Sequence, residues 1–253
     1  MPRCEGGSSK DLLRCSACSM AFYCSRECQK MHWRKDHKSA CSFYAVNRDH
    51  AIKISGNPRA WTDLVTWTQY HHASLVNASL ACYLRRVAVG KAGPDTVTML
   101  HLEMRYLNDR KLPPHRQFEL CEARFVSPGD KKWAGMCGIA TCYRPAAVAM
   151  GKREMPHTYW GTGGYLLTVR FRKEPVDIGE DYVPFWKHFA IDQERAHARP
   201  ACRNPLDQLE ENIREGRKMR FCCGRIEGAP TCCCGGWTHE TVSVISRAPA
   251  DRG

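Results

Sequence analysis

A run of cysteines and one histidine at metal-ligand spacing constrains the fold of this chain more than any other feature. Six candidate ligands fall within 27 residues, namely Cys15, Cys18, Cys24, Cys28, His37 and Cys41. The first two form a C-x2-C pair, which supplies two corners of a zinc tetrahedron from one tight turn. The other four form two pairs with a four-residue step, which places both members on one helix face. Because one zinc ion takes four ligands, the surplus predicts two zinc ions, with Cys4 as a further ligand.

The stretch from Tyr23 to Cys41, YCSRECQKMHWRKDHKSAC, resembles the MYND zinc finger. That family has an aromatic residue before the first cysteine of this stretch, a glutamine after the second, a His-Trp step, and then His-Lys and a last cysteine. The resemblance implies a small finger over residues 1–45, stabilised by two zinc ions in a cross-braced order. Carried over residue by residue, the two implied ligand sets are Cys15, Cys18, His37 and Cys41 in one site, and Cys24, Cys28 and an upstream C-x2-C pair in the other.

The second site departs from the family pattern. Cys4 stands where the second member of the upstream pair belongs, and the first member would fall on Met1. Three explanations stay open. The true start of the chain lies further upstream, or His32 completes the site from one helical turn after Cys28, or a water molecule occupies the fourth position.

A finger of this size cannot bury enough apolar surface to fold without metal, so the zinc is expected to be structural. The resemblance implies a protein-interaction module that holds short proline-containing peptides of partner proteins, including transcription-related ones. By resemblance, the peptide groove takes Ser25, Gln29 and Trp33. Gln29 could hydrogen-bond an extended peptide backbone, and Trp33 could stack on a proline. The alternative for Trp33 is packing against the domain that follows.

Beyond the finger, polar and turn-forming residues at 46–60 predict a linker. The hydrophobic periodicity then predicts a helix at 61–90, strands at 97–107, 117–126 and 164–172, and a helix at 206–221. The glycine-rich run 160–164 is interpreted as a turn. This order predicts an α+β domain over 61–245, followed by a disordered tail at 246–253. The layout resembles that of MYND-bearing proteins of mushroom-forming fungi, a resemblance that implies no particular activity.

The net charge of +12 raises the alternative of a nucleic-acid binder. The basic residues are scattered rather than gathered, so this alternative is held as secondary and nucleic acid is not the expected partner. A second alternative is a protein-modifying enzyme such as a SET-type lysine methyltransferase. Against it, three residues precede Cys4, which leaves no room there for a SET segment, and no asparagine-histidine cofactor signature follows. No catalytic residue is assigned.

The remaining features concern compartment and the other thiols. No apolar run is long enough to span a membrane, and the start lacks the apolar core of a secretory signal. With sixteen cysteines at these spacings, we expect an intracellular, metal-binding chain. A second group, Cys222, Cys223, Cys232, Cys233 and Cys234, has poor ligand spacing and is interpreted as buried or oxidation-prone thiols.

Overall fold

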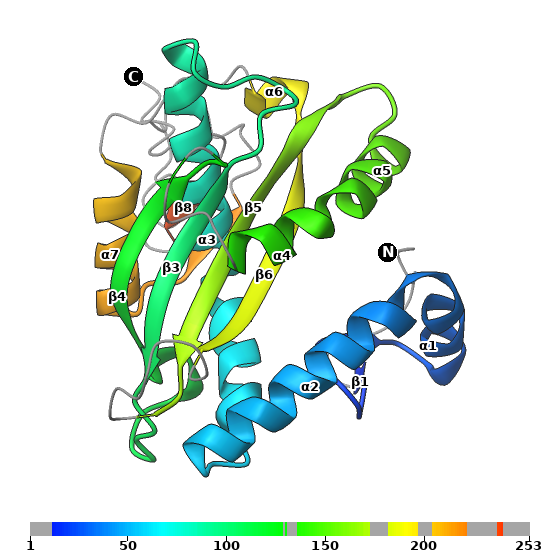
Figure 1. The fold of residues 1–253 in the computed structure, drawn as a ribbon, viewed down its shortest axis with the longest axis vertical. Coiled ribbons are helices and arrows are strands. Elements are labelled where there is room, and N and C mark those ends of the chain that lie inside the picture. The colour runs from blue at the N-terminus through cyan, green and yellow to red at the C-terminus, as the bar shows by residue number, and fades with distance from the viewer. Residues whose placement is uncertain are drawn as a thin grey trace, which may run out of the picture.

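The computed structural model describes residues 12–128, 130, 136–172, 182–196, 204–221 and 237–239 (Figure 1). Cys4, the five C-terminal cysteines and the tail at 246–253 lie outside these ranges. The N-terminal elements are β1 (Leu13–Arg14), β2 (Phe22–Tyr23), α1 (Arg26–His32), the π-helical turn η1 (Trp33–His37), α2 (Lys38–Ser55) and α3 (Ala60–Ala88).

A four-stranded mixed sheet forms the centre of the rest of the chain. Its strands are β3 (Met99–Tyr106), β4 (Phe118–Val126), β5 (Tyr159–Arg170) and β6 (Tyr182–Asp192), in the spatial order β4-β3-β5-β6. β3 and β5 are parallel, whereas β3–β4 and β5–β6 are antiparallel pairs. A parallel neighbour requires a crossover connection, and α4 (Met136–Cys142) and α5 (Arg144–Glu154) lie within it. The remaining elements are η2 (Pro114–Arg116), α6 (Gln193–Ala196), α7 (Pro205–Glu215), β7 (Met219–Phe221) and β8 (Trp237–His239).

The two faces of the sheet carry helices of different kinds (Figure 1). The long helix α3 lies behind the sheet, and most of its side chains are buried. The alternating side chains that pack toward it are Leu100, Leu102 and Met104 from β3, and Tyr165, Leu167 and Val169 from β5. The intervening residues face the other way, where Met99, Leu166 and Trp186 pack with Cys137 and Ala140 of α4. The period-2 alternation thus separates two apolar layers.

The strand predictions at 97–107 and 117–126 are confirmed by β3 and β4, and the helix prediction at 61–90 by α3. The glycine-rich run 160–164 is not a turn but the first half of β5. Its glycines permit close approach of other groups: a Cβ on Gly161 would lie 2.9 Å from the carbonyl oxygen of Pro94. On Gly163 it would lie 2.6 Å from the ring of Phe189.

Two further boundaries differ from the sequence prediction. The proposed linker 46–60 is helical as far as Ser55, where Gly56 ends α2 in the left-handed conformation with φ of 64°. Its polar residues suggested a loop, but Asn47 is buried and donates from Nδ2 to the carbonyl of Pro184. The helix predicted at 206–221 ends at Glu215, because Gly216 takes φ of 65° as the helix cap.

Within the described residues, no helix combines the length and apolar character needed to cross a membrane.

Candidate metal centre

The C-x2-C pair lies in a tight knuckle between β1 and β2. The amide of Cys15 donates to the carbonyl of Ala21, and the amide of Ser19 donates to the carbonyl of Cys15, both over 2.9 Å. Ser19 takes a positive φ of 58°, which turns the chain sharply after Cys18. The amide of Met20 then points at the Cys18 sulfur over 3.4 Å. This local hydrogen bonding orients both thiols before any metal is considered.

The histidine and the last cysteine come from an almost continuous helix. Ser25 caps α1, because its hydroxyl accepts the amide hydrogen of Cys28 over 3.2 Å. The π-helical turn η1 follows directly and passes into α2 at Lys38. π turns insert one extra residue and often occur at functional sites. His37 ends this turn and Cys41 lies one helical turn further, so both face the knuckle.

The structure brings together Cys15, Cys18, His37 and Cys41, all of them buried. Their ligand atoms lie within 4.8 Å of one another. The Sγ atoms of Cys15 and Cys41 are 3.8 Å apart, and Cys18 Sγ is 3.5 Å from His37 Nε2. A zinc tetrahedron with ordinary bond lengths has edges of about 3.8 Å between two sulfurs and about 3.5 Å between sulfur and nitrogen. The donor set and its spacing therefore fit zinc.

The electrostatics of this cluster keep Cys18 and Cys41 protonated unless a cation binds. Burial, followed by the charge of Cys18, raises the pKa of Cys41 to about 12. Burial likewise raises the pKa of Cys18. Burial acts in the same direction on Cys15, but backbone amides lower its pKa overall. Burial lowers the pKa of His37, which leaves its imidazole neutral and able to ligate. Three thiolates in one buried pocket repel one another, and a divalent metal removes that penalty.

Two side chains outside the ligand set hold the knuckle, and sequence reasoning did not assign them this role. Trp61 of α3 is fully buried and donates from Nε1 to the carbonyl of Cys18 over 2.8 Å. Arg48 of α2 donates to the carbonyls of Ser16 and Ala17. The hydrophobic periodicity that predicts the helix of Trp61 gives no indication of this contact. The metal centre is thereby attached to the larger part of the chain.

The second predicted site is defined only in part. The Sγ atoms of Cys24 and Cys28 are 3.1 Å apart, and Cys24 is exposed. Cys4 lies outside the described residues. Nδ1 of His32 is 3.0 Å from the hydroxyl of Tyr23. Among the described residues, no set of three ligands forms around the two cysteines. A role for His32 as the fourth ligand stays a prediction.

The three predicted groove residues lie along α1 and the turn that follows it. Ser25 is partly buried and acts as the helix cap, and Gln29 is also partly buried. Trp33 is 38% exposed, and the edge of its ring meets His37, with ring centroids 5.8 Å apart. Met31 nearby is exposed as well. The finger therefore presents apolar surface to solvent beside its buried metal cluster.

Comparison with known proteins agrees with this geometry. The family model of the MYND finger matches residues 2–41, so the N-terminal segment is a MYND-type zinc finger. Ubiquitin carboxyl-terminal hydrolase 17 of Arabidopsis thaliana is 28% identical over 110 residues. That match covers 39% of this chain and 15% of the hydrolase, so the chain spans a small part of this relative. No solved structure matches the chain significantly.

Proposed function

We propose that this chain is a zinc-dependent protein-interaction protein. Cys15, Cys18, His37 and Cys41 bind one zinc ion, and Cys24, Cys28 and Cys4 bind a second. The zinc supplies folding free energy and no chemical step, because four protein ligands leave no open position at the first site. The metal fixes a groove in which Ser25, Gln29 and Trp33 contact a short proline-containing peptide of an intracellular partner.

The buried three-thiol, one-imidazole cluster is the observation that carries this proposal. It explains why so small an apolar cluster can hold the finger in shape. The exposure of Trp33 supports peptide contact over packing against the sheet domain, because its edge contact is with His37 of the finger itself. An exposed indole beside a half-buried amide suits an extended peptide with a proline to stack.

The other functions have weaker support. The name of the hydrolase relative indicates that it acts on ubiquitin carboxyl termini. The match covers only 15% of its length, which is too little to support the same activity for this chain. For nucleic-acid binding the support is the net charge of +12 alone. We therefore take protein interaction as the function.

Zinc stoichiometry of the purified full chain, measured by elemental analysis, tests the metal assignment. We expect two zinc ions per chain, one of which is lost in Cys41→Ser. If His32 is the missing ligand, His32→Ala loses one zinc ion too; two ions in that variant exclude His32. One zinc ion in the parent chain would reject the second site, and none would overturn the proposal.

Titration with a fluorescent proline-containing peptide tests the groove. We expect Gln29→Ala and Trp33→Ala each to weaken binding by about tenfold, with the zinc content unchanged. Val46→Ala, which removes an exposed apolar side chain from α2, is the matched control. Equal binding by all variants would show that these residues do not form the groove.

A further inference from the structure

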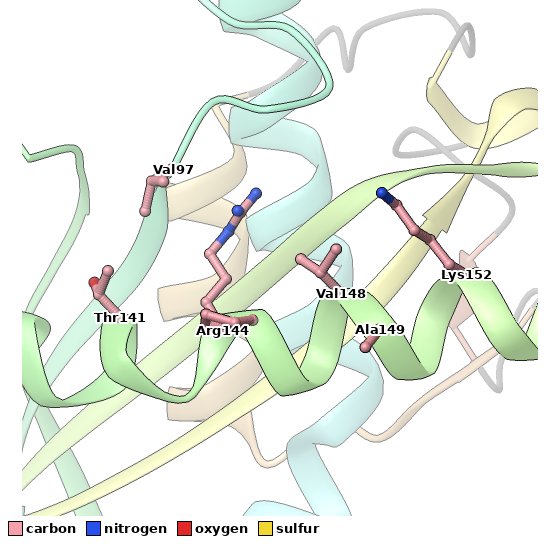
Figure 2. Close-up of a pocket in the computed structure, with 7 residues that line it drawn as sticks. Val97, Thr141, Arg144, Val148, Ala149 and Lys152 are labelled. Atoms are coloured by element: carbon pink, nitrogen blue, oxygen red, sulfur yellow. The ribbon is translucent and has the colours of Figure 1, made fainter.

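A hollow lies along α5, on the sheet face opposite α3, and the proposed function does not use it. Its volume is about 460 Å³, and its lining consists of Val97, Thr141, Arg144, Pro145, Val148, Ala149 and Lys152. Figure 2 shows Arg144, Val148 and Lys152 extending from the same side of α5. These three residues follow one another at four-residue steps, which places them in one stripe along the helix. The stripe therefore has a cation at each end and an apolar side chain between them.

The charge of this stripe comes from Arg144 and Lys152. Within the described part of the chain, neither Arg144 nor Lys152 forms an ion pair with a carboxylate. Burial, assisted by the charge of Arg144, lowers the pKa of His188 of β6 to about 4. Nε2 of His188 is buried and has no described hydrogen-bond partner. The nearest acid along the chain from Val97, Asp95, makes no salt bridge with either cation. Among the described residues, the lining of the hollow thus holds two cations and no carboxylate.

The middle of the hollow is apolar. Val97 lies across from α5 and Val148 lies on it, and both are partly buried. Pro145 and Ala149 complete the apolar lining from the next helix positions and are exposed. The two cations are eight positions apart on the α-helix, which corresponds to about 12 Å along the axis. A single small anion cannot bridge that separation, whereas an extended chain of four residues can.

We infer that this hollow, defined by Arg144, Val148 and Lys152, binds an extended acidic segment of a partner protein. An acidic residue near each end of the segment pairs with one cation, and an apolar residue between them packs on Val97 and Val148. Charge complementarity and the apolar middle select this occupant. A nucleic-acid backbone would satisfy the cations but would leave the valines without a partner. This site lies on a different element from the finger groove and goes beyond the proposed function.

Fluorescence anisotropy on the zinc-loaded full chain tests this inference. The probe is a labelled short peptide with glutamate pairs at both ends and leucine between them. We expect Arg144→Glu and Lys152→Glu each to weaken its binding by about tenfold or more. Arg153→Glu is the matched control, because it makes the same charge change on the neighbouring residue of α5, outside the lining. It should change binding by less than about twofold. Circular dichroism and zinc content verify that each variant is folded.

Two results would overturn the inference. Equal weakening by Arg153→Glu and Lys152→Glu would mean that only the overall charge attracts the probe. A second peptide with serine in place of leucine, or a single-stranded oligonucleotide of the same charge, could bind with equal affinity. That result would show that the apolar contact does not contribute to binding. Val148→Asp adds an independent variant, which should abolish the preference for leucine over serine while both cations remain.

Discussion

The finger and the sheet region hold their shape by different means. The buried cluster of the finger consists of Cys15, Cys18, Ala21, Tyr23 and Cys41. Three of these five residues are thiols, so the apolar surface alone is too small to fold it. The sheet region instead buries whole layers of aliphatic and aromatic side chains on both faces. The difference indicates that bound zinc would do in the finger what the burial of apolar side chains does in the sheet region.

Removal of zinc should produce the largest difference in stability between the finger and the sheet region. With a chelator present, we expect backbone amides between residues 12 and 45 to lose protection from hydrogen exchange, because the metal provides the folding free energy there. The amides of β3 and β5 should keep theirs. Hydrogen-exchange mass spectrometry measures both, with zinc-saturated chelator as the control. Loss of protection throughout the sheet would show that the two regions fold as one unit.

Replacement of Trp61 should weaken the attachment between the regions. Trp61→Phe removes the indole that donates to the Cys18 carbonyl and leaves a cavity, so we expect about 2–3 kcal/mol of lost stability and weaker zinc retention. Trp67→Phe is the matched control, since Trp67 is equally buried and its Nε1 has no partner in the described structure. It should destabilise the sheet region without any effect on zinc. Competition with a chromogenic chelator measures the retention.

Acid should act on the sheet region through a partly buried histidine of α3. Burial, assisted by the charge of Lys187, lowers the pKa of His72 to about 4. The unfolded chain binds this proton near pH 6.5, so stability is complete above that pH and falls as the pH drops toward 4. At pH 5 the loss is about 2 kcal/mol at most. Urea unfolding of the parent chain and His72→Gln at several pH values measures it. Identical pH dependence in the two proteins would contradict this role of His72.

The smallest effect should come from Arg48. Arg48→Ala removes the hydrogen bonds to the carbonyls of Ser16 and Ala17 but leaves the zinc ligands in place. Because these bonds lie at the surface, we expect about 1 kcal/mol of lost stability. Lys53→Ala on the same helix, with an exposed side chain, should cost less. Thermal unfolding of the zinc-loaded proteins compares the two. Equal losses would mean that Arg48 does not support the knuckle.

The spacing of candidate ligands in the sequence predicted which residues form the metal cluster. It could not predict the hydrogen bond that attaches this cluster to α3. Cys15, Cys18, His37 and Cys41 have a local pattern that zinc geometry dictates, so they could be identified without a structure. The contact of Trp61 with Cys18 joins residues far apart in sequence, and nothing in helical periodicity specifies it. β6 was also missed, because it packs on both faces, with Phe185 in one apolar cluster and Trp186 in the other, so its sequence does not alternate clearly. The linker was misjudged since Asn47 looks solvent-exposed in sequence but is buried against β6.

The helix α2 does not tolerate a change of length between two of its residues. It carries a candidate metal ligand, Cys41, near its first turn and the knuckle-binding Arg48 two turns later. Each residue of an α-helix turns the side chains by about 100° around the axis. One inserted or deleted residue between these positions would therefore rotate Arg48 away from Ser16 and Ala17. Such a change would cost the hydrogen bonds of Arg48 to the knuckle, so this segment acts as a fixed spacer.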